Sequence, residues 1–447
     1  MGEKKFDPTG YSLPILYIYG DISAIAESKD NKVKNLLYKF GEREGTCTLK
    51  GQGATSYTTA AALIKQGRAG KFNYTITFDE PFEAKKGTMF EPNPEKNKEE
   101  WWGPQKKYCL KANWIDPTHS RNVVSCKLWG TLVKNRDTVP SWSVGLPNGG
   151  AIDGFPIIMM LNDEFHGLYT MNIPKDGWMF GLVEDPAKTQ AIVSSKDHTP
   201  ATRFREASMS GYEIEFASNE DDVDWVTTSL TRLIDAIVKT DGSDLDTTIS
   251  QYLDWDSAID YYIHAVIEKA TDCIDKNFIL VTFDGIKWYF SNYDRDSIWG
   301  LNWDGSGTSR PVSNVTFIET STGEKSQRVF ELIRRFKTNA LKARYNKLRE
   351  DKLSESRIME KFENFAWSIP STVLAEDVKL YPTIQGSSVN TIDQIGRFVR
   401  QRLIKCDEWL KNLPAQETPP SGGTTYSIIT TLSGCTSSNT MTSISAN

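Results

Sequence analysis

The chain lacks several features that mark other classes of protein. Its six cysteines are scattered without a Cys-x-x-Cys pair, and its four histidines lie far apart in the sequence. This pattern argues against a structural zinc site and against a disulfide framework. The longest uninterrupted apolar run, from Phe155 to Leu161, is far shorter than the ~20 residues that a membrane span needs. We therefore predict no membrane partner.

The chain also lacks an excess of positive charge. It contains 52 basic and 58 acidic residues, which gives a formal net charge of −6. No overall basic field draws it to nucleic acid, so we expect no nucleic-acid partner. Residues Met1 to Pro8 lead into no apolar signal segment. We expect a protein of the cytoplasm, or of a particle assembled there.

The 447 residues suffice for more than one domain. The first part is rich in strand patterns: β-rich residues at Ile15 to Tyr19, period-two alternation from Phe72 to Phe78, and a buried hairpin over residues 156–171. Asp116 and Pro117 have the pattern of a helix start, and this helix is expected to run to Val133.

The second part is mostly helical. Helices are predicted at Thr228 to Val238 and Asp256 to Ala270, and residues 326–413 are nearly all helical in pattern. Two short apolar runs around Asp284-Gly285 predict a second hairpin. We therefore predict an α+β protein of two lobes, with a β-rich N-lobe and a helical C-lobe.

The predicted domain boundaries follow the changes in composition. Residues 1–174 are predicted to form the β-rich lobe, and residues 175–413 are predicted to form the helical lobe. Residues 414–447 begin with a Pro/Gly linker and continue as a Ser/Thr-rich segment. Two interpretations of that segment stay open: the start of a small β module, or a disordered tail.

The order of elements in the second part is typical of phosphoryl transfer. A loop with Asp272 and, five residues later, Asn277 follows a strong helix. A hairpin then leads to a second loop, with Asp294 and Asp296. Protein kinases use this order of parts: the first Asp accepts the hydroxyl proton, and the Asn and the later Asp hold magnesium against the phosphates.

The first part contains candidates for the phosphate side of such a site. Gly51, Gly53 and Ser56 lie in a run of small residues whose backbone N–H groups can approach a phosphate. Lys71 lies at the start of a predicted strand, where its ammonium can reach a phosphate oxygen, and Lys65 is an alternative to it. The helix predicted from Pro117 to Val133 contains no Asp or Glu, so it offers Lys71 no carboxylate partner.

These motifs, taken in order, resemble those of the CotH kinase family of atypical protein kinases. The matching residues are Gly53-Ala54-Thr55-Ser56, Lys71-Phe72-Asn73-Tyr74, Leu110-Lys111-Ala112-Asn113 with Asp116, Arg121 and Asn122, Gly167-Leu168-Tyr169, Asp272 with Asn277 and Phe278, and Asp294 with Asp296, Trp299 and Gly300. The resemblance covers about residues 10–412.

The resemblance implies a two-lobed fold of the atypical protein-kinase type, with residues 1–174 on the nucleotide-phosphate side and residues 175–413 carrying the catalytic and metal loops. It implies an ATP-dependent kinase acting on Ser or Thr hydroxyls, with Mg²⁺ or Mn²⁺ as cofactor. It implies Asp272 as the catalytic carboxylate, Asn277 and Asp294 as metal ligands with Asp296 in the same shell, and Lys71 as a phosphate contact. The implied partner is a protein substrate. A small-molecule kinase stays open, because the same phosphate groups serve other acceptors.

A second hypothesis belongs to a different class of protein. The variant segment from Gly167 to Trp178, followed at the C-terminus by the linker and the Ser/Thr-rich start of a β module, resembles CotH-like proteins of tailed phages and prophages. This resemblance implies a tail or baseplate structural protein whose kinase-like fold is inactive. Its partners would be virion proteins, in a homo-oligomer or a particle.

Overall fold

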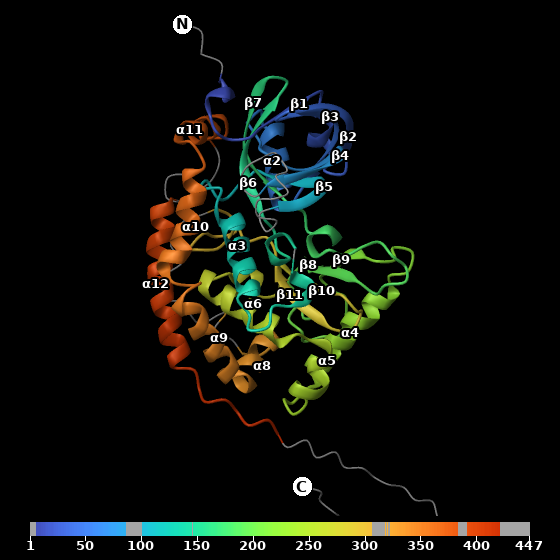
Figure 1. The fold of residues 1–447 in the computed structure, drawn as a ribbon, viewed down its shortest axis with the longest axis vertical. Coiled ribbons are helices and arrows are strands. Elements are labelled where there is room, and N and C mark those ends of the chain that lie inside the picture. The colour runs from blue at the N-terminus through green and yellow to red at the C-terminus, as the bar shows by residue number, and fades with distance from the viewer. Residues whose placement is uncertain are drawn as a thin grey trace, which may run out of the picture.

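The structure is a computed structural model that describes residues 6–85, 101–144, 146–305, 322–382 and 391–420, with residues 318 and 320. Its first part is a closed barrel of seven strands (Figure 1). They are β1 (Ile15–Tyr19), β2 (Lys32–Phe40), β3 (Arg43–Gln52), β4 (Asn73–Lys85), β5 (Trp101–Lys111), β6 (Gly154–Leu161) and β7 (Glu164–Asn172). The strand order around the barrel is β1-β2-β3-β4-β5-β7-β6.

A single parallel pairing closes this barrel. β1 lies beside β6, with Leu16 opposite Met159, whereas the other neighbouring strands are antiparallel. Alternate side chains of β1, Leu16 and Ile18, are fully buried and help to fill the interior. Closure leaves no strand edge unpaired, so the two ends of the barrel are the places where loops can present polar groups.

The second part contains a four-stranded antiparallel sheet packed among helices (Figure 1). The sheet order is β11-β10-β8-β9, from β8 (Ala191–Ser195), β9 (Tyr212–Ala217), β10 (Phe278–Thr282) and β11 (Trp288–Asn292). The central helix is α6 (Trp255–Glu268), which is buried along nearly its whole length and packs on β11. The hydrophobic core of this part therefore surrounds α6 on all sides.

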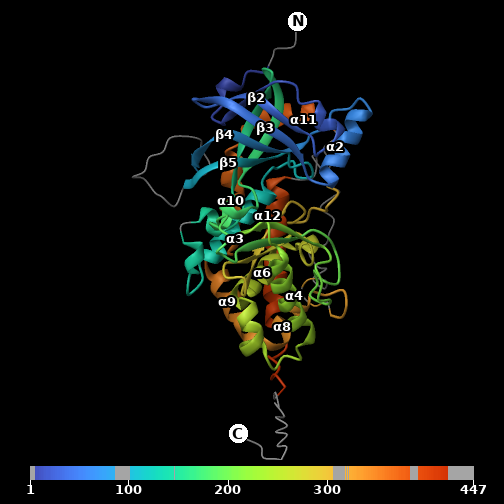
Figure 2. The ribbon, with the colours of Figure 1, turned by 90° about the vertical axis from the view of Figure 1, so that its right-hand side faces the viewer.

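The remaining helices lie around this core and beside the barrel. They are α1 (Ala24–Glu27), α2 (Thr55–Lys65), α3 (Arg121–Lys134), α4 (Asp224–Lys239), α5 (Ser250–Tyr252), α8 (Arg328–Phe336), α9 (Thr338–Glu350), α10 (Glu355–Trp367), α11 (Ser371–Leu380) and α12 (Ile392–Lys411). Figure 2 shows α2 at one side of the barrel. None of the helices in the described ranges is long and apolar enough to cross a membrane.

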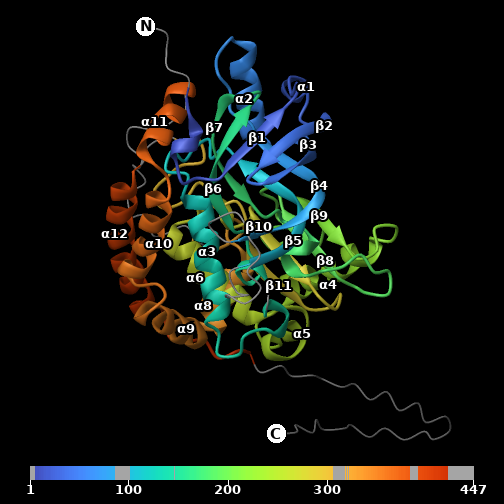
Figure 3. The ribbon, with the colours of Figure 1, turned by 45° about the horizontal axis from the view of Figure 1, so that its top comes forward.

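The two-lobed protein-kinase-like fold predicted from the sequence is wrong. The β-rich part is a closed barrel, not a kinase N-lobe, and the second part contains a four-stranded sheet, of which only the β10–β11 hairpin was predicted. Elements also cross between the parts: α3 packs on α6 and α10, and α11 packs on barrel strand β7 (Figure 3). Local periodicity predicts strands and helices but does not specify that β1 pairs with β6, so the sequence could not reveal closure.

Several predicted elements are confirmed. β1, the β6–β7 hairpin, α4 and α6 lie within four residues of their predicted bounds, and β10 and β11 form the hairpin predicted around Asp284-Gly285. β4 begins as predicted but continues to Lys85, beyond the predicted end at Phe78. The helix predicted from Pro117 begins only at Arg121, because the Asp116 carboxylate binds the backbone N–H groups of Thr118 and Arg121 in a turn before it. The boundary at residue 174 stays a prediction. The segment beyond residue 420, including the expected β module, lies outside the described residues.

Candidate active site

The loop with Asp272 and Asn277 directly follows the central helix. α6 ends at Glu268, and the left-handed backbone of the next residue, Lys269 (φ +53°), turns the chain into a single 3-10 turn, Thr271–Cys273. The Asn277 side-chain amide donates to Asp272 Oδ2 at 3.0 Å. Asn277 itself has a φ of +57°, a conformation that Asn tolerates better than most residues. The five-residue spacing seen in the sequence therefore joins these two side chains directly.

The second loop, with Asp294 and Asp296, follows β11. Arg295 between them is fully buried, with its guanidinium 4.9 Å from the Tyr261 ring centroid and 3.5 Å from a Glu268 carboxylate oxygen on α6. The Arg295 backbone N–H donates to the Asn122 side chain on α3 at 3.0 Å. Arg295 thus fixes the backbone of this loop against two helices, with one aspartate on each side of it.

The aspartates of the two loops influence one another electrostatically. Burial raises the pKa of Asp296 well above its ordinary value, and the charges of Asp294 and Asp272 raise it further. Carboxylates that repel each other in this way are neutralised by a proton or by a cation. Clustered oxygen donors of this type suit Mg²⁺. Among the described residues, however, no three His, Cys, Asp or Glu side chains already form a metal cage.

Lys111, at the end of β5, is influenced by the charges of these carboxylates. Burial alone would lower the pKa of Lys111, but nearby negative charges, the largest that of Asp294 and with Asp296 among the others, outweigh burial and raise it. Lys111 lies one residue before Ala112, whose N–H donates to the Asn73 side chain at 2.7 Å. Lys111 belongs to one of the sequence motifs, but the sequence gives it no role. Its position relative to the aspartates depends on how β5 pairs within the barrel.

The small residues of the first part meet at this same end of the barrel. The Asn73 amide also donates to the Ser56 hydroxyl at 3.0 Å, so Asn73 joins Ser56 to the end of β5. Gly53 has a φ of +95°, and a Cβ there would lie 2.3 Å from Ser56 Oγ, so only glycine fits. Gly51 lies in β3 over the Tyr57 ring, and Lys65 is exposed near the far end of α2.

Lys71 lies away from these carboxylates, in a fully buried position before β4. Its ammonium donates to the Leu168 carbonyl at 2.6 Å and contacts both oxygens of Asp377 at 2.8 Å. Asp377 belongs to α11, and its Oδ1 also accepts the Leu168 N–H at 2.8 Å. Burial opposes ionisation of Asp377, but Lys71 and His119 lower its pKa to about 2. A phosphate contact by Lys71 stays a prediction, and it requires the exchange of one of these partners.

The carboxylate partner of Lys71 was not predicted. Helix α3 contains no acidic residue, as the sequence indicated, but a carboxylate 306 residues away in the sequence takes that place. No motif marks Asp377, because its role depends on α11 folding back onto β7. The only sequence signal is a lone Asp on the helix face that also carries the buried residue Val373.

His198, in the segment between β8 and β9, lies between two aspartates. Its Nε2 is 3.2 Å from Asp272 Oδ1, and its Nδ1 is 2.6 Å from Asp275 Oδ1. These two hydrogen bonds raise the pKa of His198 to about 9, and the bond to Asp272 has the larger effect. We did not predict a role for His198 from the sequence, because nothing local to it differs from an ordinary loop histidine.

The raised pKa of His198 predicts a pH-dependent stability. Because the folded-state pKa of about 9 exceeds the ordinary value of 6.5, the stabilisation is fully present below about pH 6.5 and is lost as the pH rises through 9. We expect the Tm to fall across this window, and to fall less steeply in His198→Gln. Thermal unfolding from pH 6 to 10 measures both slopes. Equal slopes of Tm against pH in the wild-type chain and in His198→Gln would contradict the assignment of this pH dependence to His198.

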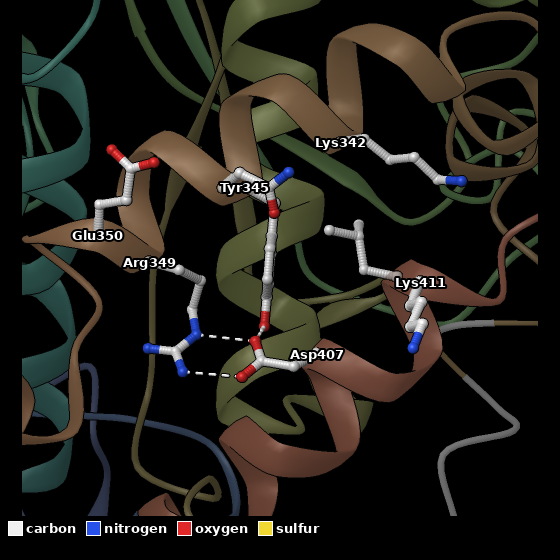
Figure 4. A pocket seen from close by; sticks show the side chains of 8 residues that line it. Lys342, Tyr345, Arg349, Glu350, Asp407 and Lys411 are labelled. Atoms are coloured by element: carbon white, nitrogen blue, oxygen red, sulfur yellow. Dashed lines mark hydrogen bonds and ion pairs between the residues drawn. The ribbon is translucent and has the colours of Figure 1, made fainter.

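A surface pocket lies elsewhere in the molecule. A cavity of about 570 Å³ between α9 and α12 is lined by charged side chains, among them Lys342, Arg349 and Asp407 (Figure 4). Arg349 contacts Asp407 through two hydrogen bonds of 2.9 Å, and the Tyr345 hydroxyl donates to the same carboxylate at 2.6 Å. Its polar groups therefore largely satisfy each other, and its lining contains none of the candidate site residues.

Comparison with known proteins identifies the family. Curated proteins of known function include no match to the chain. The family described as CotH kinase protein matches residues 66–404, which is more than half of the chain. This match contains Lys71, Lys111, both aspartate loops and Asp377, whereas Gly51, Gly53 and Ser56 precede it. Association with phage tails stays a prediction. The chain belongs to the CotH kinase family.

Proposed function

We propose that the chain transfers the γ-phosphoryl group of ATP to a Ser or Thr hydroxyl of a protein substrate, with Mg²⁺ or Mn²⁺ as cofactor. The family match supports a kinase-like activity, and the nucleotide, the metal and the acceptor are our proposal. The carrying observation is that the charges of Asp294 and Asp296, which come from a different part of the fold, act on Lys111 and outweigh its burial. Phosphoryl transfer needs cations and oxygen ligands on opposite sides of the phosphates.

The proposed roles follow from the position of each group. Asp272 accepts the proton of the acceptor hydroxyl, and the Asn277 amide fixes one of its oxygens. Asn277, Asp294 and Asp296 would hold the divalent cation, which neutralises phosphate charge when bound. Gly51, Gly53 and Ser56 line the phosphate side at the end of the barrel.

Two lysines of the first part have different proposed roles. Lys111 already experiences the negative charge of Asp294 and Asp296, and its proposed role is to neutralise phosphate charge there. Lys71 contacts phosphate after one of its bonds to Leu168 or Asp377 is exchanged. Until then it holds α11 on the barrel, as the lysine–carboxylate pair of a protein kinase holds a helix in place.

The substitution Lys111→Met tests this proposal. In the wild-type chain we expect ATP with Mg²⁺ to raise the Tm and labelled phosphate to pass to a Ser-rich protein acceptor. Lys111→Met removes the cation opposite the aspartates, so we expect kcat/KM for ATP to fall by about 10²-fold. Initial rates with labelled ATP measure the change.

Lys106→Met is the matched control, because Lys106 lies on the same strand, is exposed and donates to the backbone of Asp79 instead. Unchanged kinetics in Lys111→Met would remove Lys111 from the site. A wild-type chain without nucleotide binding or transfer would contradict the proposal. That outcome would favour the virion structural hypothesis, whose proposed partners are tail or baseplate proteins.

A further inference from the structure

His198 contacts the proposed catalytic carboxylate directly, although no sequence motif includes it. Its ring lies between two loops, with one nitrogen on Asp272 Oδ1 at 3.2 Å and the other on Asp275 Oδ1 at 2.6 Å. A neutral imidazole has one N–H donor and one acceptor nitrogen, and an acceptor facing a carboxylate is repelled. Two carboxylate partners therefore favour the imidazolium form, which donates on both sides.

Asp275, the second partner of His198, is itself firmly held. Arg203 Nε donates to Asp275 Oδ2 at 2.5 Å, and the Asp275 carbonyl accepts the Ser195 hydroxyl at 2.7 Å. Asp275 is nearly buried, whereas about 40% of the His198 side chain is exposed. Asp275 thus holds the ring of His198 in contact with Asp272.

The segment that carries His198 is also anchored. The His198 backbone N–H donates to the Asp197 side chain at 2.8 Å, and the Asp197 carbonyl accepts the Thr202 hydroxyl at 3.0 Å. The ring of His198 therefore lies against two carboxylates, those of Asp272 and Asp275. Arg203 contacts Asp275, and the Asp197 side chain contacts the backbone N–H of His198. The ring has little freedom to turn away from Asp272.

We propose that His198 is a positioning residue, which holds the Asp272 carboxylate in the orientation that accepts the proton of the substrate hydroxyl. Asp272 is fixed on Oδ1 by His198 and on Oδ2 by Asn277 at 3.0 Å, so its rotation about the Cβ–Cγ bond is restrained from both sides. A base held in one orientation avoids the entropy cost of finding it during the reaction. This inference rests on the proposed function.

The test compares His198→Ala with His198→Arg. Since the ring of His198 contacts Asp272 and Asp275 and none of the proposed phosphate or metal ligands, we expect His198→Ala to lower kcat by about 10-fold to 10²-fold with KM for ATP unchanged. Arginine restores two N–H donors and the charge, so His198→Arg should recover part of kcat. Lys196→Ala is the control, because Lys196 precedes His198 in the same segment and has only an exposed ion pair with Glu213.

A double variant tests whether His198 depends on its contact with Asp275. If it does, the variant His198→Ala/Asp275→Asn should have no lower kcat than the poorer of the two single variants. Nitrogen chemical shifts of the four histidines, measured by NMR at pH 7.5, add a readout that needs no turnover. We expect both His198 nitrogens to be protonated in the wild-type chain, and only partly in Asp272→Asn.

The outcomes distinguish the inference about His198 from the proposed function. Transfer with an unchanged kcat in His198→Ala, or a His198 ring with one unprotonated nitrogen at pH 7.5, overturns the inference and leaves the proposed function intact. No transfer by the wild-type chain overturns the proposed function, and the catalytic role of His198 with it. A lower kcat that arginine partly restores, with the KM for ATP unchanged, supports the inference.

Discussion

Asp377→Asn is expected to lower the free energy of unfolding by about 3–5 kcal/mol, because it leaves the Lys71 ammonium buried without its counter-charge. Lys71 and Asp377 are both almost completely inaccessible to solvent, so water cannot replace the lost partner. The asparagine oxygen can still accept the Leu168 N–H that Asp377 Oδ1 binds. The loss is therefore assigned to the charge. Chemical denaturation at pH 7 measures it.

A second variant distinguishes a lost ion pair from general damage to the core. Adding Lys71→Met to Asp377→Asn removes both charges, and most of the stability should return, because a buried ion pair replaced on both sides is nearly neutral. Asp235→Asn is the matched control: its partner Lys239 lies at 2.7 Å but is exposed, so the change should stay within about 0.5 kcal/mol. A double variant no more stable than Asp377→Asn would contradict this account.

Asp272→Asn is expected to lower the rate of phosphoryl transfer by about 10²–10⁴-fold, the contribution typical of a general base. Asparagine has nearly the same shape and can keep a hydrogen bond to Asn277, but it cannot accept the hydroxyl proton. Binding of ATP should persist, since Asp272 is not one of the proposed metal ligands. Initial rates of transfer and the ATP-dependent shift in Tm measure the two effects separately.

Asp351→Asn supplies the control for this experiment. Asp351 lies at the end of α9, and its carboxylate contacts Lys352 and Arg357 at the surface. We expect its kinetics to match those of the wild-type chain. Full transfer activity in Asp272→Asn would show that another group accepts the proton, whereas a simultaneous loss of the ATP-dependent Tm shift would assign Asp272 to nucleotide or metal binding instead.

The sequence alone was informative about local parts of the site. The spacing of Asp272 and Asn277 predicts two side chains on one loop, and the structure places them within one hydrogen bond. Alternation of apolar residues predicted β1, β4 and both hairpins, because a half-buried strand has a period of two whatever it packs against. The order of these motifs also pointed to the CotH kinase family, which the family match confirms.

Contacts between distant residues could not be predicted from the sequence. Closure of the barrel depends on β1 lying parallel to β6, and Lys71 meets Asp377 only because α11 packs on β7. Lys111 and His198 gain their importance from carboxylates that lie far away along the chain. Composition and periodicity describe each segment by itself. An ion pair, or the strand pairing that closes a barrel, depends on where two segments meet.

The sequence by itself determined the secondary structure of most of the described elements and the residue types available for chemistry, since both depend on neighbours along the chain. Only the tertiary structure decided which lysine faces the aspartates and which one is buried against α11. The physical reason is that burial and charge act through space. A lysine's role is set by the groups within a few ångströms of its ammonium, and the chain fold chooses those groups.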